Sequence, residues 1–174
     1  PILRERKGKA APDRNGEVTA VLVRSDAERT KGAMETLERV CGRLCEAVPF
    51  DGTQEGLMAF LSERWETFRG RAVAVLSDGV VLTPGAIERL IGVLDADASV
   101  AMVAPSSNVG SGAQGVKPKY QNLKKELEKF ARKVAHDRRG LAADVPWPDA
   151  PCVVIRKELT GIAMVGRIDS VHPV

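Results

Sequence analysis

The segment from Val73 to Leu94 constrains the fold most, because it passes from an apolar run through a polar corner into an amphipathic pattern. Its first residues are β-branched and apolar, which is typical of a strand covered on both faces of a parallel sheet. The corner Ser77-Asp78-Gly79 follows, and its glycine gives the backbone freedom to turn. Apolar residues then recur at helical spacing, at Ile87, Leu90, Ile91 and Leu94. The segment therefore predicts a strand, a corner and a helix.

The corner also carries a candidate functional residue. We expect Thr83 to cap the helix, with Pro84 at its first position. Ligands of open α/β sheets bind outside the carboxyl ends of strands, so Asp78 is a candidate ligand-binding residue. The alternative is structural, because an aspartate at a strand end often hydrogen-bonds the following turn. Both interpretations stay open from the sequence.

The length of 174 residues is enough for one domain with a substantial core. We expect residues 1–17, which are basic and broken by glycine and proline, to form a flexible N-terminal arm, and residues 18–174 to form a single domain. No stretch approaches the roughly 20 apolar residues of a membrane span, and the N-terminus lacks the apolar core of a signal peptide. Three cysteines without such a signal indicate reduced thiols. We therefore expect a soluble, cytoplasmic protein.

Strand and helix patterns alternate along the chain. Strands are predicted at residues 18–24, 44–50, 73–76, 99–104 and 152–155. Helices are predicted at about residues 26–40, 55–69, 84–94, 120–135 and 157–165. This rhythm predicts an α/β fold, a three-layer sandwich with a mainly parallel sheet.

Four pieces of the chain together carry a family resemblance. They are the corner segment Leu76–Ile91, the strand and asparagine-bearing loop Val100–Gln114, the helix that follows Tyr120, and the segment Cys152–Asp169. In this order they resemble the second half of a family 2 glycosyltransferase domain of the GT-A type. The resemblance implies a GT-A-like fold, a Rossmann-like nucleotide-binding arrangement, with a nucleotide-sugar site near Asp51, Asp78 and Asn108. It also implies Mn²⁺ or Mg²⁺ bound with the nucleotide sugar if the donor site survives, with Asp78 as the metal ligand.

The same resemblance implies a degenerate site. The family holds its metal with an Asp-x-Asp pair, since hard oxygen ligands suit Mg²⁺ and Mn²⁺. Aligned through Thr83-Pro84, those two positions fall on Ser77 and Gly79. Only Asp51-Gly52-Thr53 resembles the nucleoside pocket, and the acidic motif that carries the catalytic base of inverting members is not in the five residues after Asp169.

Two functions fit these departures. One is a non-catalytic scaffold or interaction module that needs no cofactor, because a fold does not imply its ancestral activity. The alternative is an active or partner-completed glycosyltransferase that uses a nucleotide-sugar donor. In either case we expect a protein partner or a larger assembly.

The remaining candidates have structural interpretations beside the functional ones. Residues 117–139 hold nine basic and three acidic residues, either a solvated helix face or a surface for phosphates or an acidic partner. Nucleic acid is not the expected partner, because the formal net charge is only +3. Cys41 and Cys45 are predicted to be core thiols rather than metal ligands. Trp65 is predicted to be in the core, whereas Trp147 is the better surface candidate for stacking on a sugar.

Overall fold

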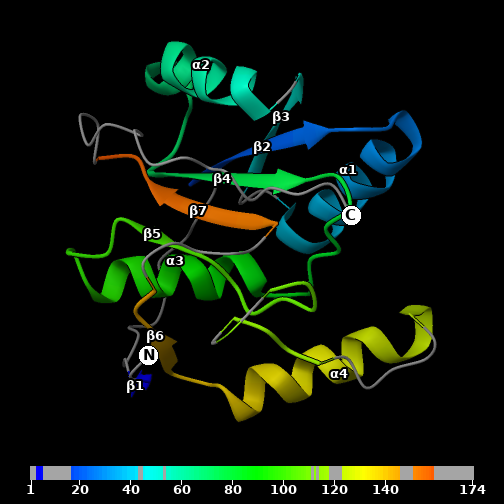
Figure 1. The fold of residues 1–174 in the computed structure, drawn as a ribbon, viewed down its shortest axis with the longest axis vertical. Helices are drawn as coiled ribbons and strands as arrows, with labels where there is room; N and C mark the ends of the chain where they lie inside the picture. Colours follow the sequence, from blue (N-terminus) through cyan, green and yellow to red (C-terminus); the bar gives the residue numbers. More distant parts are fainter. Residues whose placement is uncertain are drawn as a thin grey trace.

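The computed structural model describes residues 3–5, 17–42, 45–52, 54–110, 112, 114–117, 123–145 and 151–158. These residues form an α/β fold with a mixed sheet of five strands in the order β3-β2-β4-β7-β5 (Figure 1). A separate pair of strands, β1 and β6, lies at one end of the molecule. The α/β class predicted from the alternating pattern is confirmed.

The elements have the following bounds. The five-stranded sheet contains β2 (Val18–Arg24), β3 (Cys45–Asp51), β4 (Ala72–Ser77), β5 (Met102–Val103) and β7 (Cys152–Arg156). The pair consists of β1 (Leu3–Glu5) and β6 (Leu141–Ala143), which run antiparallel. The helices are α1 (Ala27–Cys41), α2 (Gln54–Arg64), the 3₁₀ turn η2 (Trp65–Thr67), α3 (Ala86–Ala96) and α4 (Leu123–Asp137).

The sheet is less uniformly parallel than the sequence predicts. Strand β2 pairs parallel with both β3 and β4, whereas β7 pairs antiparallel with both β4 and β5. A parallel β7 would require the chain to cross back to the amino edge of the sheet before the strand begins. Instead the chain enters β7 at the carboxyl edge, where the Ser77 amide donates to the Pro151 carbonyl at 3.0 Å. The mainly parallel sheet is therefore corrected to a mixed sheet with one reversed strand.

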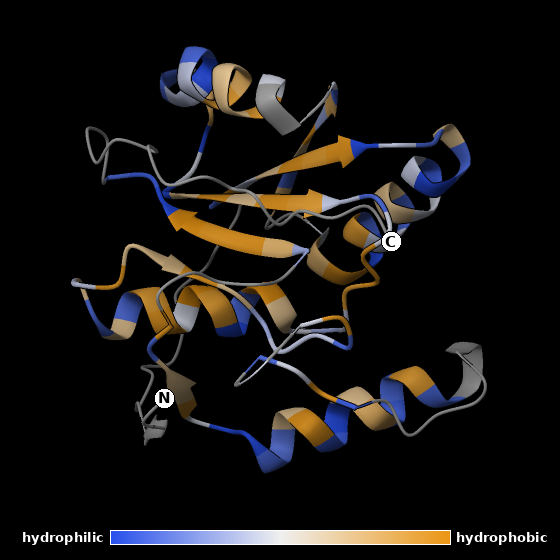
Figure 2. Ribbon diagram, viewed as in Figure 1, coloured by the Kyte–Doolittle hydropathy of each residue, from blue (hydrophilic) through white to orange (hydrophobic). Residues whose placement is uncertain are grey.

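Helices cover both faces of the sheet, as the three-layer prediction requires. Alternate residues of β4 face opposite sides: Ala74 and Leu76 pack with α1 and α3, while Val73 and Val75 pack with α2 and η2. Figure 2 shows the central strands in hydrophobic colours between these helices. Trp65 is 7% exposed and lies in the second cluster, so its predicted core position is confirmed.

Helix α3 begins later than predicted. Its first residue is Ala86, and its N-cap is Gly85, which has a φ of 74° and no side-chain cap. A left-handed backbone at Gly85 interrupts the helix on its N-terminal side, so Thr83 and Pro84 belong to a turn closed by the Ala86 amide on the Thr83 carbonyl at 3.0 Å. The predicted cap at Thr83 is wrong.

Other predicted elements differ in extent or fall outside the described residues. Strand β5 keeps two of the six residues predicted for it, and three residues of the predicted arm form β1. The predicted closing helix at 157–165 and Trp147 lie outside the described residues. Among the described residues, no helix is both long enough and apolar enough to span a membrane.

Helix α4 lies away from the five-stranded sheet (Figure 1). Arg39 of α1 forms an ion pair with Glu128 of α4 at 3.4 Å. Beyond the last turn of α4, Arg138 donates to the Ser106 hydroxyl at 3.0 Å and to the Gly115 carbonyl at 3.3 Å. Polar contacts therefore tie both α1 and the loop after β5 to this helix.

Candidate functional site

The carboxyl ends of the three parallel strands bring the predicted site residues to one edge of the sheet. The register pairs Arg24 of β2 with Asp51 of β3, and Val23 of β2 with Ser77 of β4. Asp78 extends this pairing, because its amide donates to the Val23 carbonyl at 3.1 Å. This is the edge at which open α/β sheets bind ligands.

The Asp78 side chain is buried and fully engaged at the start of α1. It is 6% exposed. Its Oδ2 accepts from the Ser25 amide at 2.7 Å and from the Asp26 amide at 3.0 Å, and its Oδ1 accepts from the Ser25 hydroxyl at 2.9 Å. The Thr30 hydroxyl lies 3.4 Å from Oδ2. The carboxylate thus binds donors that precede the helix and one from its first turn.

A second aspartate, Asp26, caps the same helix terminus. Asp26 is the N-cap of α1, and its Oδ1 accepts from the amides of Glu28 at 2.8 Å and Arg29 at 3.0 Å. Asp26 therefore satisfies two first-turn amides that lack intrahelical partners, and Asp78 accepts the amides of the two residues before the helix. Negative charge at this position is also favoured by the helix dipole.

The environment keeps Asp78 ionised. Burial alone would raise the pKa of its carboxyl, because removal from water disfavours the charged form. The hydrogen bonds from Ser25, Asp26 and Thr30 outweigh burial and lower the pKa below its usual value. Asp78 is therefore a buried carboxylate that is charged at neutral pH.

The Asp78 side chain does not make the contact with the following turn that the structural interpretation predicts. The turn that follows β4 is closed by the backbone, with the Val80 amide donating to the Ser77 carbonyl at 3.1 Å. The Asp78 side chain crosses instead to the β2–α1 loop, more than 50 residues earlier in the chain. Ser25, Asp26 and Thr30 are the partners that sequence reasoning missed.

Asp51 sits at the end of β3 and faces solvent. Its Oδ2 lies 2.9 Å from Nη1 of Arg24, and the two side chains are 69% and 33% exposed. Because β2 separates β3 from β4, Asp51 is two strand spacings, about 10 Å, from Asp78. The two predicted ligands therefore share an edge of the sheet but do not converge on one point. Within the described part of the chain, no three His, Cys, Asp or Glu residues are grouped to hold a metal ion.

The loop after β5 presents Asn108 in a closed backbone turn. The Ser107 amide donates to the Gln114 carbonyl and the Val116 amide to the Ser107 carbonyl, both at 2.9 Å. A side chain at Gly115 would meet the Gly110 carbonyl oxygen at 2.6 Å, so glycine permits this close approach. Asn108 itself is exposed. Arg138 holds the base of this loop, and no motif in the sequence indicates that role.

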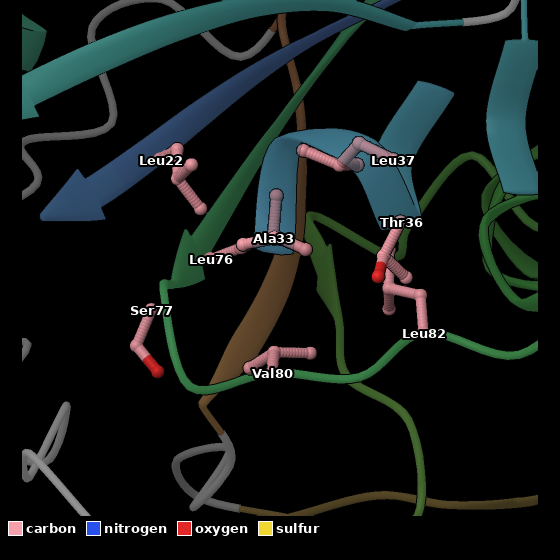
Figure 3. Close-up of a pocket in the computed structure, with 8 residues that line it drawn as sticks. All are labelled: Leu22, Ala33, Thr36, Leu37, Leu76, Ser77, Val80 and Leu82. Carbon is pink, nitrogen blue, oxygen red and sulfur yellow. The ribbon is translucent and has the colours of Figure 1, made fainter. Parts of the chain in front are cut away.

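A small apolar recess lies behind the corner (Figure 3). Leu22 and Leu76 from the sheet, Leu37 from α1 and Leu82 from the segment after the corner line it, with Ser77 at its rim. The recess is too narrow to hold a water molecule. It is therefore a gap in side-chain packing and offers no room for a nucleotide.

Comparison with known proteins gives no further assignment. No family model, no curated protein and no solved structure matches the chain at a significant level.

Proposed function

We propose that this chain is a family 2 glycosyltransferase-like domain of the GT-A type that acts as a non-catalytic scaffold or interaction module. The four sequence pieces described above support the family, and the α/β fold with its strand–corner–helix unit is compatible with it. The main support for a non-catalytic role is that the Asp78 carboxylate accepts hydrogen bonds from the amides of Ser25 and Asp26 at the start of α1.

The donor atoms at the corner do not fit a divalent cation. Mg²⁺ and Mn²⁺ bind through carboxylate oxygens with free lone pairs, and a nucleotide diphosphate adds charge that must be neutralised. Oδ2 of Asp78 already accepts two amide hydrogen bonds. Turning it toward a metal would take this acceptor away from two part-buried amides, at up to about 1–3 kcal/mol for each group.

The alternative is a transferase completed by a partner. The pairing of Arg24 with Asp51 at the carboxyl ends of β2 and β3 favours it, because these are groups that bind phosphates and sugars. In that case the partner must supply a catalytic base and the missing metal ligands. Asp51 is available to bind the nucleoside at little cost, because its ion pair with Arg24 is exposed.

Helix α4 offers the surface for an interaction role. Its exposed basic side chains in the described residues include Lys129, Arg132 and Lys133, and Arg139 follows the helix. Arg132 pairs with Glu128 at 3.4 Å and Lys133 with Asp137 at 2.9 Å, so part of this charge is balanced within the helix. We expect an acidic protein surface as the partner.

Thermal unfolding with ligands separates the two functions. The wild-type chain and Asp78→Asn would be melted with nucleoside diphosphates and nucleotide sugars, with and without Mn²⁺. The proposal predicts no ligand-dependent change in Tm for either protein. A retained donor site at about 100 times its Kd would add roughly 2.7 kcal/mol of stability.

A metal-dependent rise in Tm of the wild type would contradict the proposal and favour the partner-completed enzyme. Asp137→Asn is the matched control, because Asp137 is an exposed aspartate on α4. If the rise disappears in Asp78→Asn but persists in Asp137→Asn, Asp78 binds the donor or its metal.

A further inference from the structure

Two of the three cysteines meet where α1 leads into β3. Cys41 is the last residue of α1 and is 7% exposed, and Cys45 is the first residue of β3 and is half-buried. Gly42 ends the helix with a φ of 51°, which turns the chain back toward the sheet. Cys45 packs against the same apolar cluster that contains Cys41. Both thiols therefore lie on the α1 side of the sheet.

The two thiols are neighbours across the turn at Gly42, where Cys45 packs against the cluster that contains Cys41. The interaction between them is the main reason that the pKa of Cys41 is lowered and that of Cys45 is raised. Cys41 is thus the sulfur that ionises first. Thiolates are the nucleophiles of sulfur chemistry.

Cys152 does not belong to this pair. It lies opposite Leu76 at the carboxyl edge, whereas Cys45 lies opposite Val18 at the amino edge. Three strand spacings separate β3 from β7, about 14 Å, which exceeds the roughly 7 Å that a disulfide can bridge between Cα atoms. Cys152 is also fully buried, and burial raises its pKa to about 12.

We infer that Cys41 and Cys45 are a redox-sensitive pair that a peroxide converts into a reversible intrachain disulfide. The disulfide would join the end of α1 to the start of β3, an outer strand of the sheet. The other end of α1 is already held by Asp78. Oxidation would therefore attach both ends of this helix to the sheet. A small oxidant is needed because Cys41 is almost enclosed.

The chemistry requires no group beyond the peroxide. The Cys41 thiolate attacks one peroxide oxygen, the O–O bond breaks, and hydroxide leaves. Cys45 then attacks the sulfenic sulfur of Cys41, so that the S–S bond forms and the S–O bond breaks. The released oxygen leaves as water with the Cys45 proton. Each sulfur loses one electron, and the peroxide is reduced to two waters.

Peptide mapping of the wild-type chain tests the pairing directly. The folded protein would be treated with hydrogen peroxide, its free thiols alkylated, and the product digested with trypsin without reduction. Arg43 lies between the two cysteines, so cleavage places Cys41 in the peptide 40–43 and Cys45 in the peptide 44–64. Cys152 falls in the peptide 140–156.

The expected product is a linked pair of peptides 40–43 and 44–64 that dithiothreitol separates, with Cys152 alkylated. Cys152→Ser should give the same linked pair, whereas Cys45→Ser should leave Cys41 unlinked and open to oxidation to sulfinic acid. A linkage that contains peptide 140–156 would overturn the inference. So would wild-type protein in which Cys41 and Cys45 stay alkylatable, or become sulfinic acids, without linking.

Discussion

Charged side chains bind helix ends at both edges of the sheet, and their sign differs between the two edges. At the amino edge, Arg156 at the end of β7 donates to the carbonyls of Leu94, Asp97 and Val100 around the end of α3. The next residue, Lys157, donates to the Phe68 carbonyl beyond η2, on the other face of the sheet. At the carboxyl edge the roles are reversed, because the carboxylate of Asp78 accepts amides that precede α1. Each charge matches the helix dipole at its end.

The position of a residue at a ligand-binding edge does not by itself assign its function. Arg156 and Lys157 attract no functional interpretation, since cations at helix C-termini are a common structural device. Asp78 lies at the edge where ligands bind in open α/β sheets. Its contacts are nevertheless of the same structural kind as those of Arg156, because its carboxylate accepts amides at a helix N-terminus and Arg156 donates to carbonyls at a helix C-terminus. Its hydrogen-bond partners, rather than its position, indicate what it does.

The largest expected effect comes from breaking the carboxyl-edge contact. We predict that Asp78→Asn lowers the free energy of unfolding by about 3 kcal/mol, because an amide group replaces a buried charged acceptor that binds two part-buried amide donors. Urea denaturation at neutral pH measures it. The exposed control Asp137→Asn should lower the free energy of unfolding only slightly, because it removes only the exposed ion pair with Lys133. An Asp78→Asn variant as stable as the wild type, or more stable, would indicate a residue retained for function rather than for folding.

A somewhat smaller effect is expected at the amino edge. Arg156→Met keeps the length of the side chain but leaves the carbonyls at the end of α3 without their donor. We predict a loss of about 2 kcal/mol, which corresponds to roughly 4–8 °C in Tm for a chain of this size. Calorimetry measures it against Arg132→Met, whose arginine side chain is 80% exposed. Equal melting temperatures for the two variants would contradict a stabilising role of Arg156 at the end of α3.

The smallest effect is expected for the exposed ion pair of the carboxyl edge. Asp51→Asn removes the charge that pairs with Arg24, but the Asp51 side chain is 69% exposed. We predict a loss of about 0.5 kcal/mol or less, reduced further by salt. Urea denaturation at low and moderate ionic strength checks this. A loss as large as that of Asp78→Asn would show that the two aspartates act as one site.

Much of the fold could be predicted from local patterns. Strand β2 has the predicted bounds, and α1 begins within one residue of its predicted start, because β-branched runs and capping residues act within a few positions. The direction of β7 could not be predicted, since it depends on where a long connection re-enters the sheet. The start of α3 was missed because the left-handed backbone at Gly85 outweighed the capping signal of Thr83.

The candidate site was predictable in position but not in its contacts. The strand end identified Asp78, and parallel pairing brought Asp51 to the same edge. Neither observation indicates that the Ser25 and Asp26 amides approach the carboxylate, because that contact arises from the packing of α1 against the sheet. The Arg156 and Lys157 caps were missed for the same reason, although two cations directly after a strand were a usable signal.

The pH dependence of the Asp78 contribution tests the central claim most directly. The pKa of Asp78 is lowered in the folded state, so its stabilising contribution is complete above the unfolded-state pKa of about 3.9 and is lost as the pH falls through the lower folded-state value. Asparagine cannot ionise. Denaturant unfolding of wild type and Asp78→Asn, from neutral to strongly acidic pH and without ligand, should therefore show a large stability difference that shrinks in acid. A difference near zero at neutral pH, or one that does not change with pH, would contradict a carboxylate that stabilises α1.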